Sequence, residues 1–441
     1  MSFAQTAFAL KSRTVRASAG AFRDELVSHD TWSAEALRQL QVSRATEIAR
    51  FAAVRSPFYA HAYRTAGVSI DDLRRPGAWE RLPVIDRSAL KAAGEEVATP
   101  DATPKTARPA KTGGSTGEPL QTMHDARVPT LALAWRMYGW WGVEPWDDIA
   151  RVGRWGFGPR ESLVNRVSWW PTRQLYLDAS LINDESMHRF AREVRRTRPK
   201  LMEGYVGAML EFADFLEREG LEIPAPVAVA TSAAPLTPDA RHRLANVFGA
   251  PVYDEYRGSE VGWMAGECTA QEGLHEFGDA RLIEILDADG SPCAVGQVGD
   301  VVITDLTNRV YPIVRYRLGD RGSWLGDECP CGRPYRRLNQ PEGRVTDVLR
   351  LPSGAALNHR LMAMFSAYPE SVRLFQIHQR ADHSIVVRVV LGDPADAALH
   401  VERAVDDLRR RIAHEVPVTI EHVDSLPYTG GKIKYVISDI S

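Results

Sequence analysis

The sequence predicts an α/β protein with a large, layered N-terminal domain over residues 1–343 and a small α+β domain over residues 344–441. Three observations predict this fold class. The chain has 441 residues, which is long for a single domain. Helix and strand signals alternate through its middle, and the last 95 or so residues show a separate pattern of strands around one helix.

The middle of the chain carries the layered pattern. Apolar residues at helical spacing predict a helix over 202–220, and residues 227–230 are typical of a short buried strand. A Thr-Pro pair at 237–238 predicts the start of a second helix, which ends at Gly249. A further strand is expected at 251–253. Segment 98–119, rich in Pro and Gly, is predicted to be a polar loop between helices.

The tail predicts a compact α+β unit. Residues 371–379 and 384–391 are expected to form two strands joined by a short turn. A helix follows, because apolar residues recur three and four positions apart between 398 and 412. A last strand is expected over 416–423. The boundary of this small and mobile domain is placed at 343–347, after a loop rich in Gly, Pro and Cys.

Composition excludes several classes of function. Lys plus Arg number 54 and Asp plus Glu 57, so the net charge of −3 gives no electrostatic footprint for nucleic acid or an anionic membrane. No apolar run is long enough to span a bilayer. Four Cys exclude a disulfide scaffold, and we expect a cytoplasmic protein. The basic residues before Asp24 loosely resemble a targeting peptide, but a terminal arm or helix is the favoured interpretation.

A loop at 111–119, Lys-Thr-Gly-Gly-Ser-Thr-Gly-Glu-Pro, is the first candidate for chemistry. Its glycines and hydroxyl side chains can surround phosphate oxygens. It is not a P-loop, because no Gly-Lys-Ser/Thr ends it. Taken alone, an ordinary turn is the commoner explanation.

Three further segments carry residues that suit nucleotide chemistry. Tyr256 and Glu260 flank a Gly-Ser turn, so an aromatic ring could stack on a base and a carboxylate could hold Mg²⁺ near phosphates. Asp320 follows a glycine at an expected strand end, where it could accept ribose hydroxyls. Lys432 follows two glycines close to the C-terminus. Each has an ordinary alternative: a solvated Glu, a turn-capping Asp and a surface Lys.

In their order and spacing, these motifs resemble the adenylate-forming (acyl- and aryl-CoA ligase) superfamily, and within it the phenylacetate–CoA ligase branch. The resemblance covers the chain from about residue 40 to its end. It implies that ATP phosphates are held by the glycine-rich loop and that adenine lies beside the segment 231–236. The nucleotide residues it implies in these two segments are Thr112, Gly113, Gly114, Ser115, Thr116, Gly117, Ala233, Ala234 and Pro235.

The resemblance also implies roles for the later motifs. Tyr256 would stack on adenine within the segment that continues through Arg257, Gly258 and Ser259. Asp320 would bind ribose, and Arg344 would lie near the nucleotide at the hinge between the domains. The catalytic residues would be Glu260, which contacts Mg²⁺, and Lys432, which bridges the carboxylate and the α-phosphate.

The reaction implied by this family has two steps. A carboxylic acid, which we expect to be aromatic, attacks the α-phosphate of ATP to give an acyl-adenylate and pyrophosphate, and a nucleophile then displaces AMP. The expected acceptor is the thiol of CoA, with ATP and Mg²⁺ as the other requirements. An amine or a carrier-protein thiol is the alternative acceptor, and a non-catalytic nucleotide-binding protein is a remoter one. A homodimer would fit the resemblance.

Two positions depart from the family pattern. Arg257 stands where a Gly usually follows the aromatic residue, and Glu118 stands where a Lys is common before the proline of the phosphate loop. One positive charge near the phosphates is therefore missing, and Arg257 is a candidate to replace it.

The cysteines suggest a metal site. Three thiols and one imidazole make a complete tetrahedral set of ligands for a structural Zn²⁺. Cysteine and histidine residues at similar positions occur in part of the branch that the sequence resembles. The proposed ligands are Cys268, His275, Cys329 and Cys331. Free cysteines are the alternative, since Cys-x-Cys spacing is less diagnostic than Cys-x₂-Cys.

The acid pocket is the least determined feature. Segment 135–170 holds seven Trp interleaved with Arg, which suits a flat aromatic acid with a polar substituent. Buried core Trp and solvated Arg are equally consistent with it. The candidates for pocket residues are Trp140, Trp141, Tyr205 and Gly207.

Overall fold

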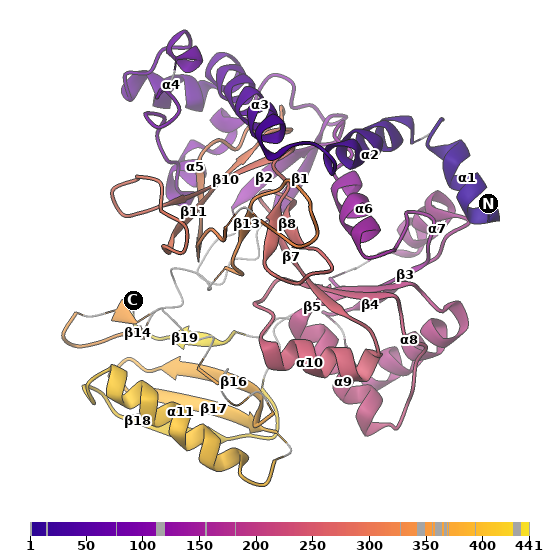
Figure 1. The fold of residues 1–441 in the computed structure, drawn as a ribbon, viewed down its shortest axis with the longest axis vertical. Helices are drawn as coiled ribbons and strands as arrows, with labels where there is room; N and C mark the ends of the chain where they lie inside the picture. The colour runs from indigo at the N-terminus through magenta and orange to yellow at the C-terminus, as the bar shows by residue number, and fades with distance from the viewer. Residues whose placement is uncertain are drawn as a thin grey trace. The chain divides into compact units, whose positions relative to one another are not determined.

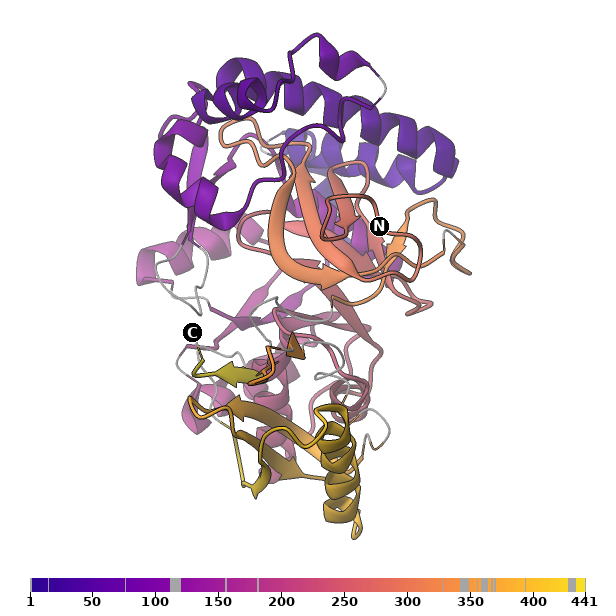
Figure 2. The same ribbon diagram turned by 90° about the vertical axis from the view of Figure 1, so that its left-hand side faces the viewer.

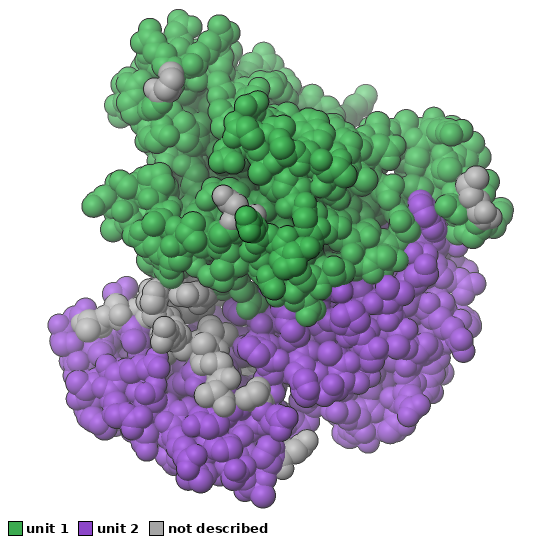
Figure 3. All heavy atoms as spheres, in the orientation of Figure 1, with its two compact units in different colours: residues 1–145, 255–341 green, residues 146–254, 342–441 purple. Residues whose placement is uncertain are grey.

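The computed structural model of the protein contains two compact units, which are coloured separately in Figure 3. Unit 1 comprises residues 1–145 and 255–341, and unit 2 comprises residues 146–254 and 342–441. The residues that the structure describes are 2–14, 16–75, 77–111, 120–154, 157–180, 182–326, 328–341, 349–354, 356–357, 364–365, 368, 370–392, 394–426 and 434–440.

Unit 1 begins with helices. They are α1 (Phe3–Lys11), α2 (Ala17–His29), α3 (Ala34–Arg55), α4 (Pro57–Thr65), α5 (Arg87–Ala93) and α6 (Leu131–Trp140). Serine side chains set two of the starts: Ser33 accepts from the Ala36 N–H before α3, and Ser56, followed by Pro57, caps α4. In Figure 2 these indigo and purple helices lie beside the orange strands of the same unit.

The strands of unit 1 are antiparallel. Strands β1 (Ala107–Lys111) and β2 (Gln121–Asp125) form a hairpin. Strands β10 (Arg281–Leu286), β11 (Gly299–Asp305) and β12 (Tyr316–Gly322) form a second sheet. The unit also holds β8 (Trp263–Glu267), β9 (Leu274–Glu276) and β13 (Arg337–Leu338), which continue from the second half of β7 (Val252–Arg257). Apolar side chains from these strands and from α3–α5 share one core.

Unit 2 contains a parallel sheet in the order β7-β6-β5-β3-β4, with β7 contributing its first half. The strands are β3 (Ile149–Gly153), β4 (Gln174–Asp178), β5 (Leu201–Tyr205) and β6 (Ala228–Ser232). Gly204 lies where β5 approaches β3 so closely that a Cβ would sit 2.7 Å from the Val152 carbonyl oxygen. The connecting helices are α7 (Pro159–Trp169), α8 (Asp184–Thr197), α9 (Val206–Arg218) and α10 (Pro238–Phe248).

The tail of unit 2 forms its own mixed sheet in the order β18-β17-β16-β19. The strands are β16 (Val372–Gln379), β17 (Ile385–Leu391), β18 (Val418–His422) and β19 (Val436–Ser438), and a short pair is formed by β14 (Leu349–Arg350) and β15 (Ala356–Leu357). Helix α11 (Ala397–Arg411) lies along this sheet (Figure 1). Its apolar stripe includes Val401, Val405 and Leu408, which join the core that also holds α8–α10.

The predicted fold class, layered α/β followed by a smaller α+β unit, is confirmed. Two local predictions were wrong. Residues 202–205 belong to strand β5 and the helix begins only at Val206, because the apolar run of a fully buried strand merges with that of the helix after it. Residues 107–111 form strand β1 inside the expected loop, since hairpin pairing overrides weak local propensity.

The two-domain boundary expected at 343/344 falls within residues 342–348, outside the described residues. Among the residues that the structure describes, no helix combines the length and the hydropathy needed to cross a membrane.

Candidate active site and metal centre

The aromatic and acidic nucleotide motifs meet in unit 1. The Tyr256 hydroxyl, near the end of β7, donates a hydrogen bond of 2.8 Å to Asp320 Oδ2 on β12. The two residues are 64 positions apart in sequence, so their pairing is a product of the fold. A ring that could stack on a base therefore lies next to a carboxylate that could accept ribose hydroxyls.

Glu260 follows on the turn between β7 and β8. The Gly258 N–H donates to the Val261 carbonyl oxygen at 3.1 Å, which makes this turn tight. The Glu260 side chain is only 12% exposed, and its Oε1 lies 3.5 Å from Arg87 Nη1. A carboxylate oxygen is a ligand that Mg²⁺ prefers, so Glu260 fits the metal role implied for it.

Two residues that sequence reasoning missed support this turn. His124 of β2 contacts the Ser259 carbonyl oxygen through Nε2 at 3.0 Å. Burial lowers the pKa of His124, so the ring is neutral at pH 7, and because a carbonyl only accepts, Nε2 carries the proton. Arg87, at the start of α5, is the second. No local motif marks either residue, because both act across long sequence separations.

Arg257 has partners of its own. Its Nε lies 3.4 Å from Glu255 Oε2, and its guanidinium lies 5.5 Å from the centre of the Trp263 ring. The side chain of Glu255 is buried, so this ion pair ties Arg257 to its own strand. The structure thus gives Arg257 a role in holding β7 against β8.

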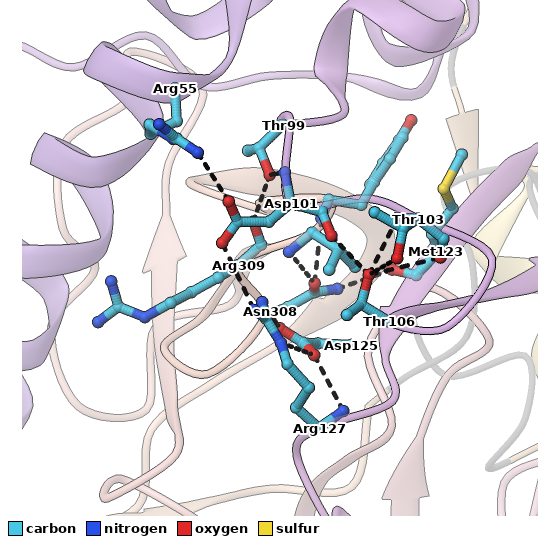
Figure 4. A network of polar contacts seen from close by, with 12 residues as sticks. Arg55, Thr99, Asp101, Thr103, Thr106, Met123, Asp125, Arg127, Asn308 and Arg309 are labelled. Atoms are coloured by element: carbon cyan, nitrogen blue, oxygen red, sulfur yellow. Dashed lines mark hydrogen bonds and ion pairs between the residues drawn. The ribbon is translucent and has the colours of Figure 1, made fainter.

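A polar network holds the paired strands β1 and β2, which lie on either side of the predicted phosphate loop in the sequence (Figure 4). Asn308 donates from Nδ2 to the Met123 carbonyl oxygen at 2.8 Å, and Thr99 donates to the Arg309 carbonyl oxygen at 2.7 Å. Arg127 pairs with Asp125 at 2.7 Å and lies 3.5 Å from Asp101. These contacts hold the end of the hairpin where β1 begins and β2 ends.

The residues expected to lie beside adenine are in unit 2. Ala233, Ala234 and Pro235 follow the carboxyl end of β6, and Ala233 has a φ of +73°, a conformation that costs a non-glycine residue energy and that clusters at functional sites. Tyr205 and Gly207 lie where β5 passes into α9. The carboxyl ends of parallel strands are the usual ligand edge of such sheets.

Several predicted site residues lie outside the described residues. They are Thr112, Gly113, Gly114, Ser115, Thr116 and Gly117 of the phosphate loop, Arg344 at the hinge, and Lys432 in the tail.

The four predicted metal ligands come together in unit 1. One ligand atom from each of Cys268, His275, Cys329 and Cys331 lies within 4.8 Å of the others. Cys268 Sγ is 3.7 Å from Cys329 Sγ, and Cys331 Sγ is 3.4 Å from His275 Nε2. Tetrahedral zinc, with bonds of about 2.3 Å to sulfur and about 2.0 Å to nitrogen, sets such atoms about 3.5–3.8 Å apart.

The chemistry of the ligand set also fits a metal. Burial lowers the pKa of His275 to about 4, so its ring is neutral at pH 7, the form that binds metal ions. The sulfur separation of 3.7 Å is far longer than the ~2.05 Å of a disulfide bond. Cys293, the fourth cysteine of the chain, lies outside this group.

A buried charged network holds the loop that carries Cys329 and Cys331. The Tyr335 hydroxyl, just after that loop, donates to Asp30 Oδ1 at 2.7 Å and accepts from Arg136 at 2.8 Å. Arg136 also pairs with Asp279, whose other partner is His29 at 2.9 Å. Burial opposes ionisation, but Arg136 and His29 still hold the pKa of Asp279 below its usual value. The metal loop is thereby joined to the end of α2.

Trp140 and Trp141 are packed into this same region. The Trp140 indole donates to Asp30 at 2.8 Å, and its ring lies 5.8 Å from that of His275. The Trp141 indole donates to the Glu267 carbonyl oxygen at 2.9 Å. Both are buried, so their contacts favour the core alternative over the acid pocket.

Comparison with known proteins extends the argument to the whole chain. The phenylacetate–coenzyme A ligase of Thermus thermophilus is 26% identical, with 92% of this chain and 98% of that protein covered. The Escherichia coli enzyme of the same name is 24% identical, with 91% and 95% covered. Residues 352–439 match the CapK C-terminal domain family.

A solved structure agrees with these sequence relatives. The 2-hydroxyisobutyryl-CoA ligase in its postadenylation state, in complex with R3-HIB-AMP, superposes with a TM-score of 0.73 at 20% identity, covering 93% of this chain and 91% of that one. The chain is thus similar in sequence to phenylacetate–coenzyme A ligases and in fold to an acyl-CoA ligase.

Proposed function

We propose that this adenylate-forming chain activates a carboxylic acid, aromatic by its sequence relatives, and transfers the acyl group to the thiol of CoA. The likeness to phenylacetate–coenzyme A ligases over more than nine-tenths of the chain carries the proposal. The Tyr256–Asp320 pair beside Glu260 supports it, because stacking, ribose binding and metal binding are what ATP requires.

In the first step a carboxylate oxygen attacks the α-phosphorus of ATP, and pyrophosphate leaves to give an acyl-adenylate. In the second step a thiolate attacks the acyl carbon, and AMP leaves. Both reactants in the first step are anions, so positive charge must lie between them. Glu260 would hold the Mg²⁺ that supplies part of this charge, and Lys432 would supply the rest.

We also propose that Cys268, His275, Cys329 and Cys331 hold a structural zinc ion. A set of four protein ligands leaves no open position for substrate, which is typical of structural sites. The ion would fix the loop that ends at Tyr335 and take no part in the reaction.

ATP–pyrophosphate exchange tests the proposed function. The purified chain, with Mg²⁺, would be assayed against benzoic, phenylacetic, cinnamic, 2-hydroxyisobutyric and simple alkyl acids. Exchange with an aromatic acid, followed by thioester formation on addition of CoA, would support the proposal. If exchange occurs but the final product forms only when an amine replaces CoA, the chain is an amide synthetase. If ATP binds but no acid supports exchange, the proposed activation of an acid is contradicted.

A further inference from the structure

A cation lies against Glu260, and it comes from a segment outside every predicted motif. Arg87 Nη1 is 3.5 Å from Glu260 Oε1, and 40% of the Arg87 side chain is exposed. Arg87 is the first residue of α5, and Asp86 caps this helix by accepting from the Ala89 N–H at 2.8 Å. The cap fixes where the helix starts and therefore where Arg87 projects.

The backbone before Arg87 is tied to the strand that carries Asp320. Ile85 pairs with Tyr316 of β12, with its N–H donating to the Arg315 carbonyl oxygen and its own carbonyl oxygen accepting from the Arg317 N–H, each at 2.8 Å. The turn that carries Glu260 is held by the contact of His124 with the Ser259 carbonyl oxygen. Three segments distant in sequence thus converge on one carboxylate and one guanidinium.

The predicted phosphate-binding loop has one positive charge fewer than is common in the resembled family. The loop at 111–119 carries Glu118 where the resembled family commonly has Lys. Arg257, the replacement suggested by the sequence, is engaged with buried Glu255 and with Trp263. Arg87 is the cation that the structure brings to Glu260 instead.

We propose that Arg87 binds the β- and γ-phosphates of ATP and that Glu260 directs its guanidinium toward them. This inference rests on the proposed function. An ion pair of 3.5 Å at a part-exposed site contributes little by itself, so the contact with Glu260 serves mainly to orient the guanidinium. Its planar fork forms strong paired hydrogen bonds with phosphate oxygens.

The test compares equilibrium binding of ATP and AMP to the full-length chain in Mg²⁺ by titration calorimetry. In Arg87→Ala, the Kd of ATP should rise about ten- to hundredfold, as expected for a lost charged hydrogen bond. The Kd of AMP, which lacks the β- and γ-phosphates, should stay within about twofold, and Arg87→Lys should recover part of the ATP affinity. The matched control is Arg75→Ala, since Arg75 is 74% exposed and pairs with Asp72.

Three results would overturn the inference. Unchanged ATP affinity in Arg87→Ala would remove the phosphate contact while leaving the proposed function standing. An equal loss of ATP and AMP affinity would mean that Arg87 only supports the fold of the site. A wild-type chain that binds neither nucleotide would overturn both the inference and the proposed function.

Discussion

At the scale of single residues, partners decide what the site side chains can do. Asp320 and Glu260 are both carboxylates on turns or strand ends, and either could be an ordinary surface acid. The hydroxyl of Tyr256 orients Asp320, whereas the guanidinium of Arg87 faces Glu260. Asp320 is thus suited to accept hydrogen bonds from hydroxyl groups, and Glu260 is suited to bind cations.

The role of Asp320 leads to the first prediction. Asp320→Ala should weaken the binding of both ATP and AMP by about ten- to hundredfold, because the ribose is common to the two nucleotides. Asp289→Ala, in the exposed turn before β11, is the control. Fluorescence titration with a ribose-unmodified nucleotide measures the effect, and retained AMP affinity would remove Asp320 from the site.

A second carboxylate predicts a pH effect on stability. Burial raises the pKa of Asp239 on α10 to about 7, although Arg243 and Arg373 oppose the shift and Glu370 adds to it. The unfolded value is near 3.9, so the folded chain binds this proton more tightly. The stabilisation is therefore complete below about pH 4 and is lost as the pH rises through 7.

Asp239→Asn removes this titration. At pH 8 the variant should be more stable than the wild type by roughly 1–2 kcal/mol, after allowance for solvent screening. Near pH 4 the two should be alike. Thermal unfolding between pH 4 and pH 8 checks this, and a difference that is constant across the range would contradict it.

At the scale of elements, the metal loop and α2 depend on each other. Cys329 and Cys331 lie on a loop with little regular structure, and Tyr335 then enters a buried network shared with His29 and Asp30 at the end of α2. Because His275 also lies against Trp140, the ligands and the network form one block of unit 1.

The proposed metal site predicts that substitutions of Cys331 and Cys293 differ in their effect on zinc content and stability. Cys331→Ser should lose bound zinc and lower the melting temperature by several degrees, since a ligand present at about a hundred times its Kd stabilises by about 2.7 kcal/mol. Cys293→Ser, outside the ligand set, should retain one zinc per chain. Elemental analysis with thermal unfolding separates the two, and zinc retained in Cys331→Ser would refute the assignment.

The buried network predicts a larger loss of stability. Asp279→Ala leaves Arg136 buried without its carboxylate partner, and such a change typically costs about 3–5 kcal/mol. Asp24→Ala is a surface control of the same chemistry, since the Asp24 side chain is 79% exposed. Denaturant unfolding gives the difference, and a loss below about 1 kcal/mol would show that Arg136 finds compensation elsewhere.

The helices and strands differ in how well the sequence predicts them. Strands β16, β17 and β18 and helix α11 were predicted within a few residues, because each has a clear period and a turn on either side. The strand expected over 416–423 is not the last one, since β19 follows it. Strand β5 was merged with α9, since a strand buried on both faces has no alternation to reveal it. Motif residues such as Tyr256 could be found by local pattern, whereas Arg87 and His124 could not, because their roles arise from contacts with residues 135 or more positions away.

At the scale of the whole molecule, the predicted site residues are divided between the two units. Tyr256, Glu260 and Asp320 belong to unit 1, while Ala233 and the tail that carries Lys432 belong to unit 2. A two-step reaction has different needs in each step: the first joins two anions, and the second expels AMP from a neutral acyl carbon. A cation delivered by the tail would matter for the first step alone.

Lys432 therefore provides the prediction that separates the half-reactions. Lys432→Ala should slow ATP–pyrophosphate exchange by at least about a hundredfold, the order of effect seen when a group stabilising transition-state charge is removed. Conversion of a supplied acyl-adenylate to the CoA thioester should stay within about threefold of the wild type. Lys434→Ala, two residues further along, is the matched control, because it changes the same charge in the same segment. Equal losses in both half-reactions would mean that Lys432 supports the fold of the tail, since a residue that acts only on the attacking carboxylate and the α-phosphate has no partner in the second step.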